Sequence, residues 1–148
     1  MIKEIFTNSD RETEAAGAAF AEELLKREDG NNCVFVAMYG DLGVGKTAFV
    51  RGAASVLSPT ARVQSPTYTI VNEYRGGSFD LLHFDFYRIE DEDSLDSIGF
   101  WDYLDRKAIA FGEWSEKIPF ALPRKRYAVS MEKTDDGDGR RIRIEKIG

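Results

Sequence analysis

A short glycine-rich segment, residues 40–47 with the sequence GDLGVGKT, contains residue types that could bind phosphate. It fits every position of the pattern G-x-x-x-x-G-K-[ST], in which backbone N–H groups surround the phosphates of a nucleotide. The Lys46 ammonium would reach the β- and γ-phosphates, which makes it a candidate catalytic residue, and the Thr47 hydroxyl would complete the shell of a Mg²⁺ ion. The nucleotide-binding residues predicted on this basis are Asp41, Leu42, Gly43, Val44, Gly45, Lys46, Thr47 and Ala48.

Two acidic residues, Asp85 and Glu113, each end a segment that is predicted to be a buried strand. The carboxyl ends of parallel strands meet beside a phosphate loop, so both acids could face the nucleotide. One carboxylate would complete the metal shell and the other would position or activate the attacking water. The alternative is that one of the two is a solvated residue at the end of its strand.

Other polar residues near these acids have two interpretations each. Arg88 could neutralise charge on the γ-phosphate, or pair with the acidic run at residues 90–93. The segment Ser65-Pro66-Thr67 could sense the γ-phosphate or form an ordinary turn. His83 is the only histidine, and within an apolar strand it is more often a hydrogen-bonded structural residue than a base or a ligand.

The segments on both sides of the glycine-rich run are those that a phosphate loop requires. Residues 33–39 form a continuous apolar run, typical of a strand buried on both faces. Residues 46–57 place apolar side chains at helical spacing, and Ser58-Pro59 ends the predicted helix. This order puts the phosphates at a helix N-terminus, which favours anions, so an accidental glycine turn is the weaker interpretation.

The remaining pattern predicts an α/β fold of the P-loop NTPase type, with three layers, a mainly parallel central sheet and antiparallel edge strands. Further strands are expected at residues 2–7, 69–75, 79–87, 126–133 and 140–147. Ser9 and Glu12 fit a capping box at the start of a helix. This helix would bury Ala15, Ala16, Ala19, Phe20 and Leu24. An acidic segment from Glu90 opens a further helical region.

Length and composition limit the classes of protein that remain. The 148 residues predict one domain over residues 1–148, and 43% hydrophobic with 31% charged residues is ordinary for a soluble protein. The chain has no apolar run of the roughly 20 residues that span a bilayer, and its start lacks an apolar signal core. A single cysteine fits a reducing compartment, so we expect a cytoplasmic protein.

The net charge indicates what kind of partner to expect, and a sequence motif indicates which nucleotide. A net charge of −6 argues against direct binding to a nucleic-acid backbone, so a partner is expected to hold any RNA. The one tight basic group, residues 124–126, is small. The string nearest to a guanine-specificity motif, at residues 132–135, begins with a glutamate and fits poorly, which favours adenine and therefore ATP.

Four motifs taken together resemble those of the bacterial TsaE (YjeE) ATPases, which belong to the machinery that makes threonylcarbamoyladenosine in tRNA. They are the phosphate loop at 40–47, SPTYT at 65–69, HFDFYR at 83–88 and EW at 113–114. The resemblance implies binding of ATP and Mg²⁺ and slow hydrolysis by the isolated protein. It also implies two protein partners, the carbamoyl-transferring subunit and its inactive paralogue.

The resemblance further implies roles for individual residues. Thr47 and Glu113 would contact Mg²⁺, and Asp85 would serve the hydrolytic step. Thr13 would lie near the adenine. Residues 65–69 would form a nucleotide-responsive loop, and Trp114 would sit beside the site.

Two other functions share the phosphate loop. A small-molecule kinase would also need an acceptor pocket and usually an arginine-bearing lid, for which the region between Arg88 and the last hairpin offers only Arg106, Arg124 and Arg126. A nucleotide-gated binding module would bind the nucleotide without hydrolysing it, even with its partners present.

Overall fold

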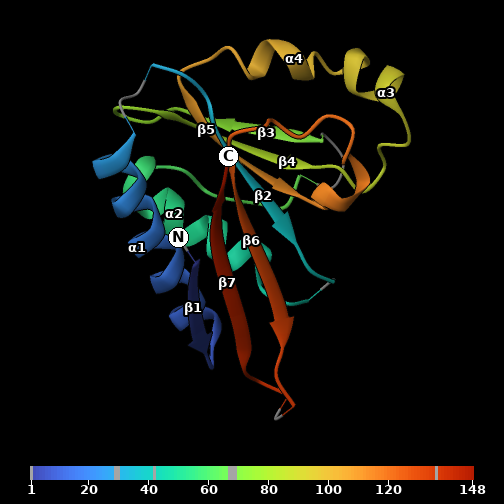
Figure 1. Ribbon diagram of the computed structural model, residues 1–148. Helices are drawn as coiled ribbons and strands as arrows, with labels where there is room; N and C mark the ends of the chain where they lie inside the picture. The colour runs from blue at the N-terminus through green and yellow to red at the C-terminus, as the bar shows by residue number, and fades with distance from the viewer. Residues whose placement is uncertain (1, 29–30, 42, 67–69, 136) are drawn as a thin grey trace.

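The strands form one mixed sheet at the centre of the molecule. The computed structural model describes residues 2–28, 31–41, 43–66, 70–135 and 137–148. Within these residues seven strands pair in the order β1-β7-β6-β2-β5-β4-β3 (Figure 1). The strands are β1 (Ile2–Thr7), β2 (Val34–Tyr39), β3 (Val71–Tyr74), β4 (Asp80–Asp85), β5 (Ala108–Glu113), β6 (Arg126–Lys133) and β7 (Arg140–Ile147).

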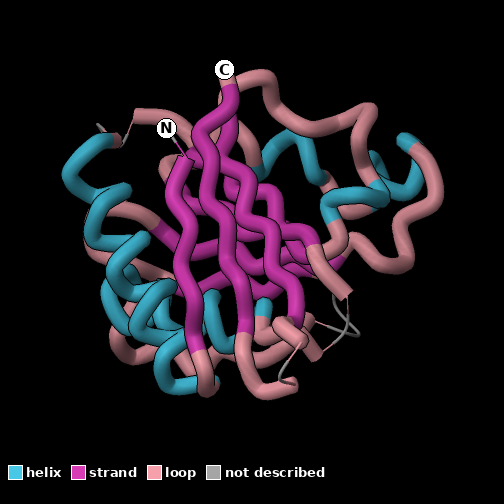
Figure 2. Tube along the Cα trace, turned by 60° about the horizontal axis from the view of Figure 1, so that its bottom comes forward, coloured by secondary structure: helices cyan, strands magenta, loops and turns pink. Residues whose placement is uncertain are grey.

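The centre of the sheet is parallel and its edges are antiparallel. Strands β6, β2, β5 and β4 run parallel, whereas β1 and β7 add antiparallel to one side and β3 to the other. Parallel neighbours need covered faces, and helices lie on both sides of the strands (Figure 2). These are α1 (Asp10–Arg27), α2 (Lys46–Leu57), α3 (Glu92–Ser97), α4 (Phe100–Tyr103) and the 3₁₀ turn η1 (Ser115–Lys117). The predicted three-layer α/β fold is confirmed.

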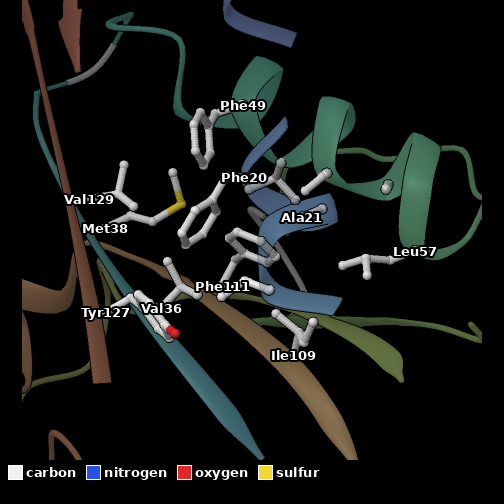
Figure 3. Close-up of a cluster of buried hydrophobic side chains, with 14 of the residues drawn as sticks. Phe20, Ala21, Val36, Met38, Phe49, Leu57, Ile109, Phe111, Tyr127 and Val129 are labelled. Atoms are coloured by element: carbon white, nitrogen blue, oxygen red, sulfur yellow. The ribbon is translucent and has the colours of Figure 1, made fainter. Parts of the chain in front are cut away.

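Each face of the sheet has its own aromatic core. Under α1 and α2, the Phe20 ring lies between those of Phe49, Phe111 and Tyr127, with centroid distances of 5.8, 6.4 and 5.6 Å (Figure 3). The core of the other face is built around the rings of Phe84, Phe86 and Phe100 and includes Leu95 of α3. Strand residues alternate between the two cores, as a strand buried on both faces requires.

The capping of α1 follows the prediction, and so does the burial of Ala16, Phe20 and Leu24. The Glu12 N–H donates to Ser9 Oγ at 3.1 Å, and the Glu12 carboxylate accepts from the N–H of Asn8 rather than of Ser9. Ala15 and Ala19 are exposed, so the expectation that they are buried is wrong. Besides the three correctly predicted residues, the face that packs inward contains Thr13, Gly17 and Ala21. Alanine occurs both in protein cores and on exposed helix faces, so the residue type alone did not show which alanines of this helix are buried.

The predicted hairpin is shorter than expected. Strands β3 and β4 pair antiparallel between Val71–Tyr74 and Leu81–Phe84. Thr69 lies outside the described residues, and Arg75, Phe79 and residues 86–87 fall outside the strands. No helix in the described part of the chain has the length and apolar composition to cross a bilayer.

The two helices on the phosphate-loop side cross at glycines. A Cβ on Gly52 of α2 would lie 1.8 Å from the carbonyl oxygen of Glu14 in α1, and a Cβ on Gly17 would lie 2.0 Å from that of Phe49. Both obstacles are backbone atoms, so a side chain at either position would force the helices apart.

We expect Gly52→Ala to lower the free energy of unfolding by about 3 kcal/mol, because the helices must separate and lose packing. Urea denaturation followed by circular dichroism measures this loss. Gly77→Ala is the matched control, since a Cβ there meets nothing within 4 Å. Equal stability of the two variants would contradict the tight crossing.

Candidate nucleotide and metal site

The glycine-rich segment connects the end of β2 to the start of α2, as the pattern requires. Gly45 is the N-cap of α2 and has a φ of 95°, in the left-handed region that a glycine adopts without strain. It supplies no side-chain acceptor for the first N–H groups of the helix. Those groups and the helix dipole therefore favour an anion at this position.

A cavity of about 620 Å³ opens at this helix N-terminus, a volume in the range of small-ligand sites. The phosphate loop, the ends of β4 and β5, and the start of β7 all contribute to it. Its lining residues are Asp10, Gly43, Gly45, Lys46, Thr47, Ala48, Arg51, Ser65, Ile70, Asp85, Tyr87, Arg88, Glu113, Trp114 and Arg140. The structure thus brings the loop together with both strand-end acids.

Lys46 is almost fully buried, with 4% of its surface exposed. Its ammonium donates to the Gly40 carbonyl and lies 4.1 Å from the centre of the Trp114 ring. Burial lowers the pKa of Lys46, and the negative charges of Glu113, Glu116, Asp85 and Asp41 oppose this shift. The site therefore holds a desolvated cation that a phosphate group would stabilise.

Asp85 and Glu113 are direct partners across the parallel strands β4 and β5. The Asp85 carboxylate accepts the Tyr87 N–H at 2.9 Å. Burial is the main cause that raises the pKa of Asp85, and the charge of Glu113 adds to it. Asp85 is thus a carboxylate whose affinity for a proton exceeds that of an ordinary aspartate.

Glu113 is also buried, and a single one of its oxygens contacts two neighbours. Thr47 Oγ1 donates to Glu113 Oε2 at 3.4 Å, and His83 Nε2 is hydrogen-bonded to the same oxygen. His83 is thus placed as the hydrogen-bonded residue that was the favoured interpretation of its sequence position.

The oxygen atoms of Thr47, Asp85 and Glu113 are hard ligands of the kind that Mg²⁺ prefers. Among the described residues, no group of three or more His, Cys, Asp or Glu side chains is arranged to hold a metal ion. Mg²⁺ commonly binds through one or two carboxylates together with phosphate oxygens, without an all-protein cage. This set of ligands therefore fits Mg²⁺ bound together with a nucleotide.

The other predicted site residues divide between the cavity and its surroundings. Ser65, Arg88 and Trp114 line the cavity. Trp114 has a φ of 60°, uncommon for a large side chain, and its ring lies edge-on to that of Tyr87 at 5.0 Å. Leu42 and Thr67 lie outside the described residues.

Three predicted residues do not line the main cavity. Asp41 is exposed and lines a smaller cavity together with Gly40 and Lys133. Val44 is 4% exposed and packs into the core under α1 and α2. Thr13 is buried, and its hydroxyl donates to the Ser9 carbonyl and lies 2.8 Å from that of Thr7, so its place near an adenine stays a prediction.

Sequence reasoning missed Arg140, which reaches the site from the start of β7. Its Nη2 donates to the Gly43 carbonyl at 3.3 Å, and its Nη1 to the hairpin carbonyls of Asp138 and Gly139 at 3.1 Å. The residue is 97 positions from Gly43, and its surroundings contain no motif. Only the strand order, in which β7 pairs with β6 and β6 pairs with β2, could have indicated it.

The sheet order and the phosphate loop, with two strand-end acids beside it, define a P-loop NTPase-like α/β protein. Comparison with known proteins then identifies its family. The model of the family described as threonylcarbamoyl adenosine biosynthesis protein TsaE matches residues 7–142. The chain belongs to the TsaE family, and the resemblance inferred from the four motifs is confirmed.

Individual relatives agree with this assignment. The tRNA threonylcarbamoyladenosine biosynthesis protein TsaE of Haemophilus influenzae is 39% identical over 120 residues, which cover 81% of this chain and 75% of the relative. The protein of the same name from Bacillus subtilis is 37% identical over 113 residues, with coverages of 76% and 70%. The crystal structure of Bacillus subtilis YdiB superposes with a TM-score of 0.79 at 29% identity and covers 100% of this chain and 88% of YdiB.

Proposed function

We propose that this protein is a Mg²⁺-dependent ATPase required for the threonylcarbamoyladenosine modification of tRNA. The observation that carries the proposal is one cavity lined by Lys46, Thr47, Asp85 and Glu113. This combination supplies a cation for the phosphates, oxygen ligands for a metal ion and a second carboxylate for water. The names of the relatives supply the pathway.

The residues of the chain have separate tasks in this proposal. The loop amides bind the phosphates, and Lys46 moves from the Gly40 carbonyl to the β- and γ-phosphates. Thr47 and Glu113 would hold Mg²⁺, which neutralises charge on the phosphate oxygens when it is bound. Asp85 orients the attacking water and accepts its proton, a role that suits a carboxylate with a raised pKa.

The partners in the proposal are the carbamoyl-transferring subunit and its inactive paralogue, which would hold the tRNA in the cytoplasm. The net charge of −6 supports indirect rather than direct contact with RNA. In this view residues 1–148 act as a single ATPase domain, and hydrolysis resets or activates the complex without modifying the adenosine itself. Ser65, Thr67, Arg88 and Trp114 would respond to the nucleotide.

Phosphate release, measured for the protein alone and with both partners, tests the proposal. We expect slow release by the protein alone, faster release with both partners, and loss of release in EDTA. Modification of tRNA, measured in the same mixtures, should require ATP. Phosphate transfer to a small-molecule acceptor would instead indicate a kinase, and nucleotide binding without hydrolysis in the full mixture would indicate a gated binding module.

A further inference from the structure

The one histidine of the chain, His83, is fully buried in β4 on the same side of the sheet as Asp85. Its Nε2 atom is hydrogen-bonded to Glu113 Oε2 on the neighbouring strand β5. None of the roles proposed above for the reaction uses this side chain, although it touches a residue that would hold the metal ion.

The contact defines which nitrogen carries hydrogen. An ionised carboxylate only accepts hydrogen bonds, so Nε2 of His83 is the donor to Glu113. The other nitrogen, Nδ1, is buried and has no hydrogen-bond partner among the described residues. A hydrogen on Nδ1 would be a buried donor without a partner among the described residues, so the geometry favours the hydrogen on Nε2, where Glu113 accepts it.

The same oxygen of Glu113 is approached from a second side. Thr47 Oγ1, in the first turn of α2, donates to Oε2 at 3.4 Å, while His83 holds it from the sheet. Buried side chains have few rotamers available, and a carboxylate held from two elements has fewer still. The charges of two neighbours also act on this carboxylate: Lys46 attracts it and Asp85 repels it.

We infer that His83 is a positioning residue that fixes the Glu113 carboxylate for the metal ion. The inference rests on the proposed function, because it assumes that Glu113 helps to bind Mg²⁺. Groups that hydrogen-bond a metal ligand typically contribute 10- to 100-fold to metal affinity. A purely structural histidine would instead affect folding without changing the metal requirement.

Three substitutions separate these possibilities. His83→Phe keeps a ring but removes the donor. His83→Gln places an amide donor at about the reach of Nε2, whereas His83→Asn places it nearer the backbone. Leu81→Val, a buried change on the same face of β4, is the control for lost packing.

Mg²⁺ is titrated into the protein with the fluorescent nucleotide mant-ADP, and the Mg²⁺ concentration that gives half of the total change in mant-ADP binding is measured. The affinity for mant-ADP in EDTA, without Mg²⁺, is the baseline. We expect His83→Phe and His83→Asn to raise this concentration roughly 10- to 100-fold with the EDTA baseline unchanged. His83→Gln should restore most of the loss, and Leu81→Val should match the wild type. Glu113→Ala shows the full loss of this ligand.

Specific results would overturn the inference. One is a half-maximal Mg²⁺ concentration in His83→Phe that equals the wild-type value; if the phenylalanine variant does not fold, the same result in His83→Asn counts. The other is a rise of this concentration in Leu81→Val as large as the rise in the His83 variants. A wild-type protein whose mant-ADP binding does not respond to Mg²⁺ would overturn the proposed function, and with it the inference that rests on it.

Discussion

Replacing Lys46 with alanine should reduce ATP turnover by roughly 10²- to 10³-fold, the usual effect of removing one group that stabilises developing phosphate charge. The Lys46 ammonium is buried within the cavity, where charge interactions are much stronger than in water. The loss should also appear as weaker binding of ATP, measured by titration with a fluorescent analogue.

The fold should survive this change. Burial lowers the pKa of Lys46, so its charged form is less favourable in the folded chain than in the unfolded one. Thermal melting at neutral pH should therefore still show a cooperative transition, with a Tm lowered only by the loss of the buried stem and of the hydrogen bond to the Gly40 carbonyl. Lys26→Ala, an exposed change in the last turn of α1, is the control that should leave turnover unchanged. Normal turnover in the Lys46 variant would remove the phosphate-loop assignment.

Replacing Asp85 with asparagine should lower turnover roughly 10²- to 10⁴-fold while leaving ATP binding intact, because in the proposed mechanism the change removes the general base but no contact to the phosphates. An asparagine side chain retains an oxygen that can accept the Tyr87 N–H now bound by Asp85. Single-turnover hydrolysis together with ATP titration separates the two effects. A variant with normal turnover would eliminate the catalytic role of Asp85.

The Tm of the Asp85→Asn variant shows whether a loss of turnover comes from the missing carboxylate or from a damaged fold. The pKa of Asp85 is raised in the folded state, so this carboxylate reduces stability as pH rises from the ordinary aspartate range through the raised value. The asparagine variant should therefore melt at or above the wild-type Tm at neutral pH. Asp80→Asn is the control for turnover, because Asp80 starts the same strand and does not line the cavity. Its carboxylate pairs with Arg106 at 3.1 Å, so this variant is expected to keep normal turnover but to lose some stability.

The features that could be predicted from the sequence are those that depend on short local patterns. The bounds of α2, β6 and β7 agree with the expected ones because alternation, helical spacing and Ser58-Pro59 act within a few residues. Asp85 and Glu113 could be placed together because parallel strands bring their carboxyl ends to one edge.

What could not be predicted depends on contacts between distant segments. Arg140 reaches Gly43 only because β7 pairs with β6, which pairs with β2. Nothing in the sequence around Arg140 indicates that strand order. The contact of Lys46 with Trp114 likewise needs the left-handed backbone at Trp114, which its residue type disfavours. The roles of all the predicted site residues, Thr13 and Thr67 among them, stay predictions.

The alternation along β4 has a consequence for the fidelity of folding. His83 and Asp85 point to the face that holds the site, whereas Leu82 and Phe84 enter the core of the opposite face. A slip of one residue against β5 would bury an aspartate in that core and place Phe84 in the cavity. Misaligned pairings are therefore disfavoured on both faces at once, so the aromatic core on one face of the sheet helps to fix the alignment of the cavity residues on the other.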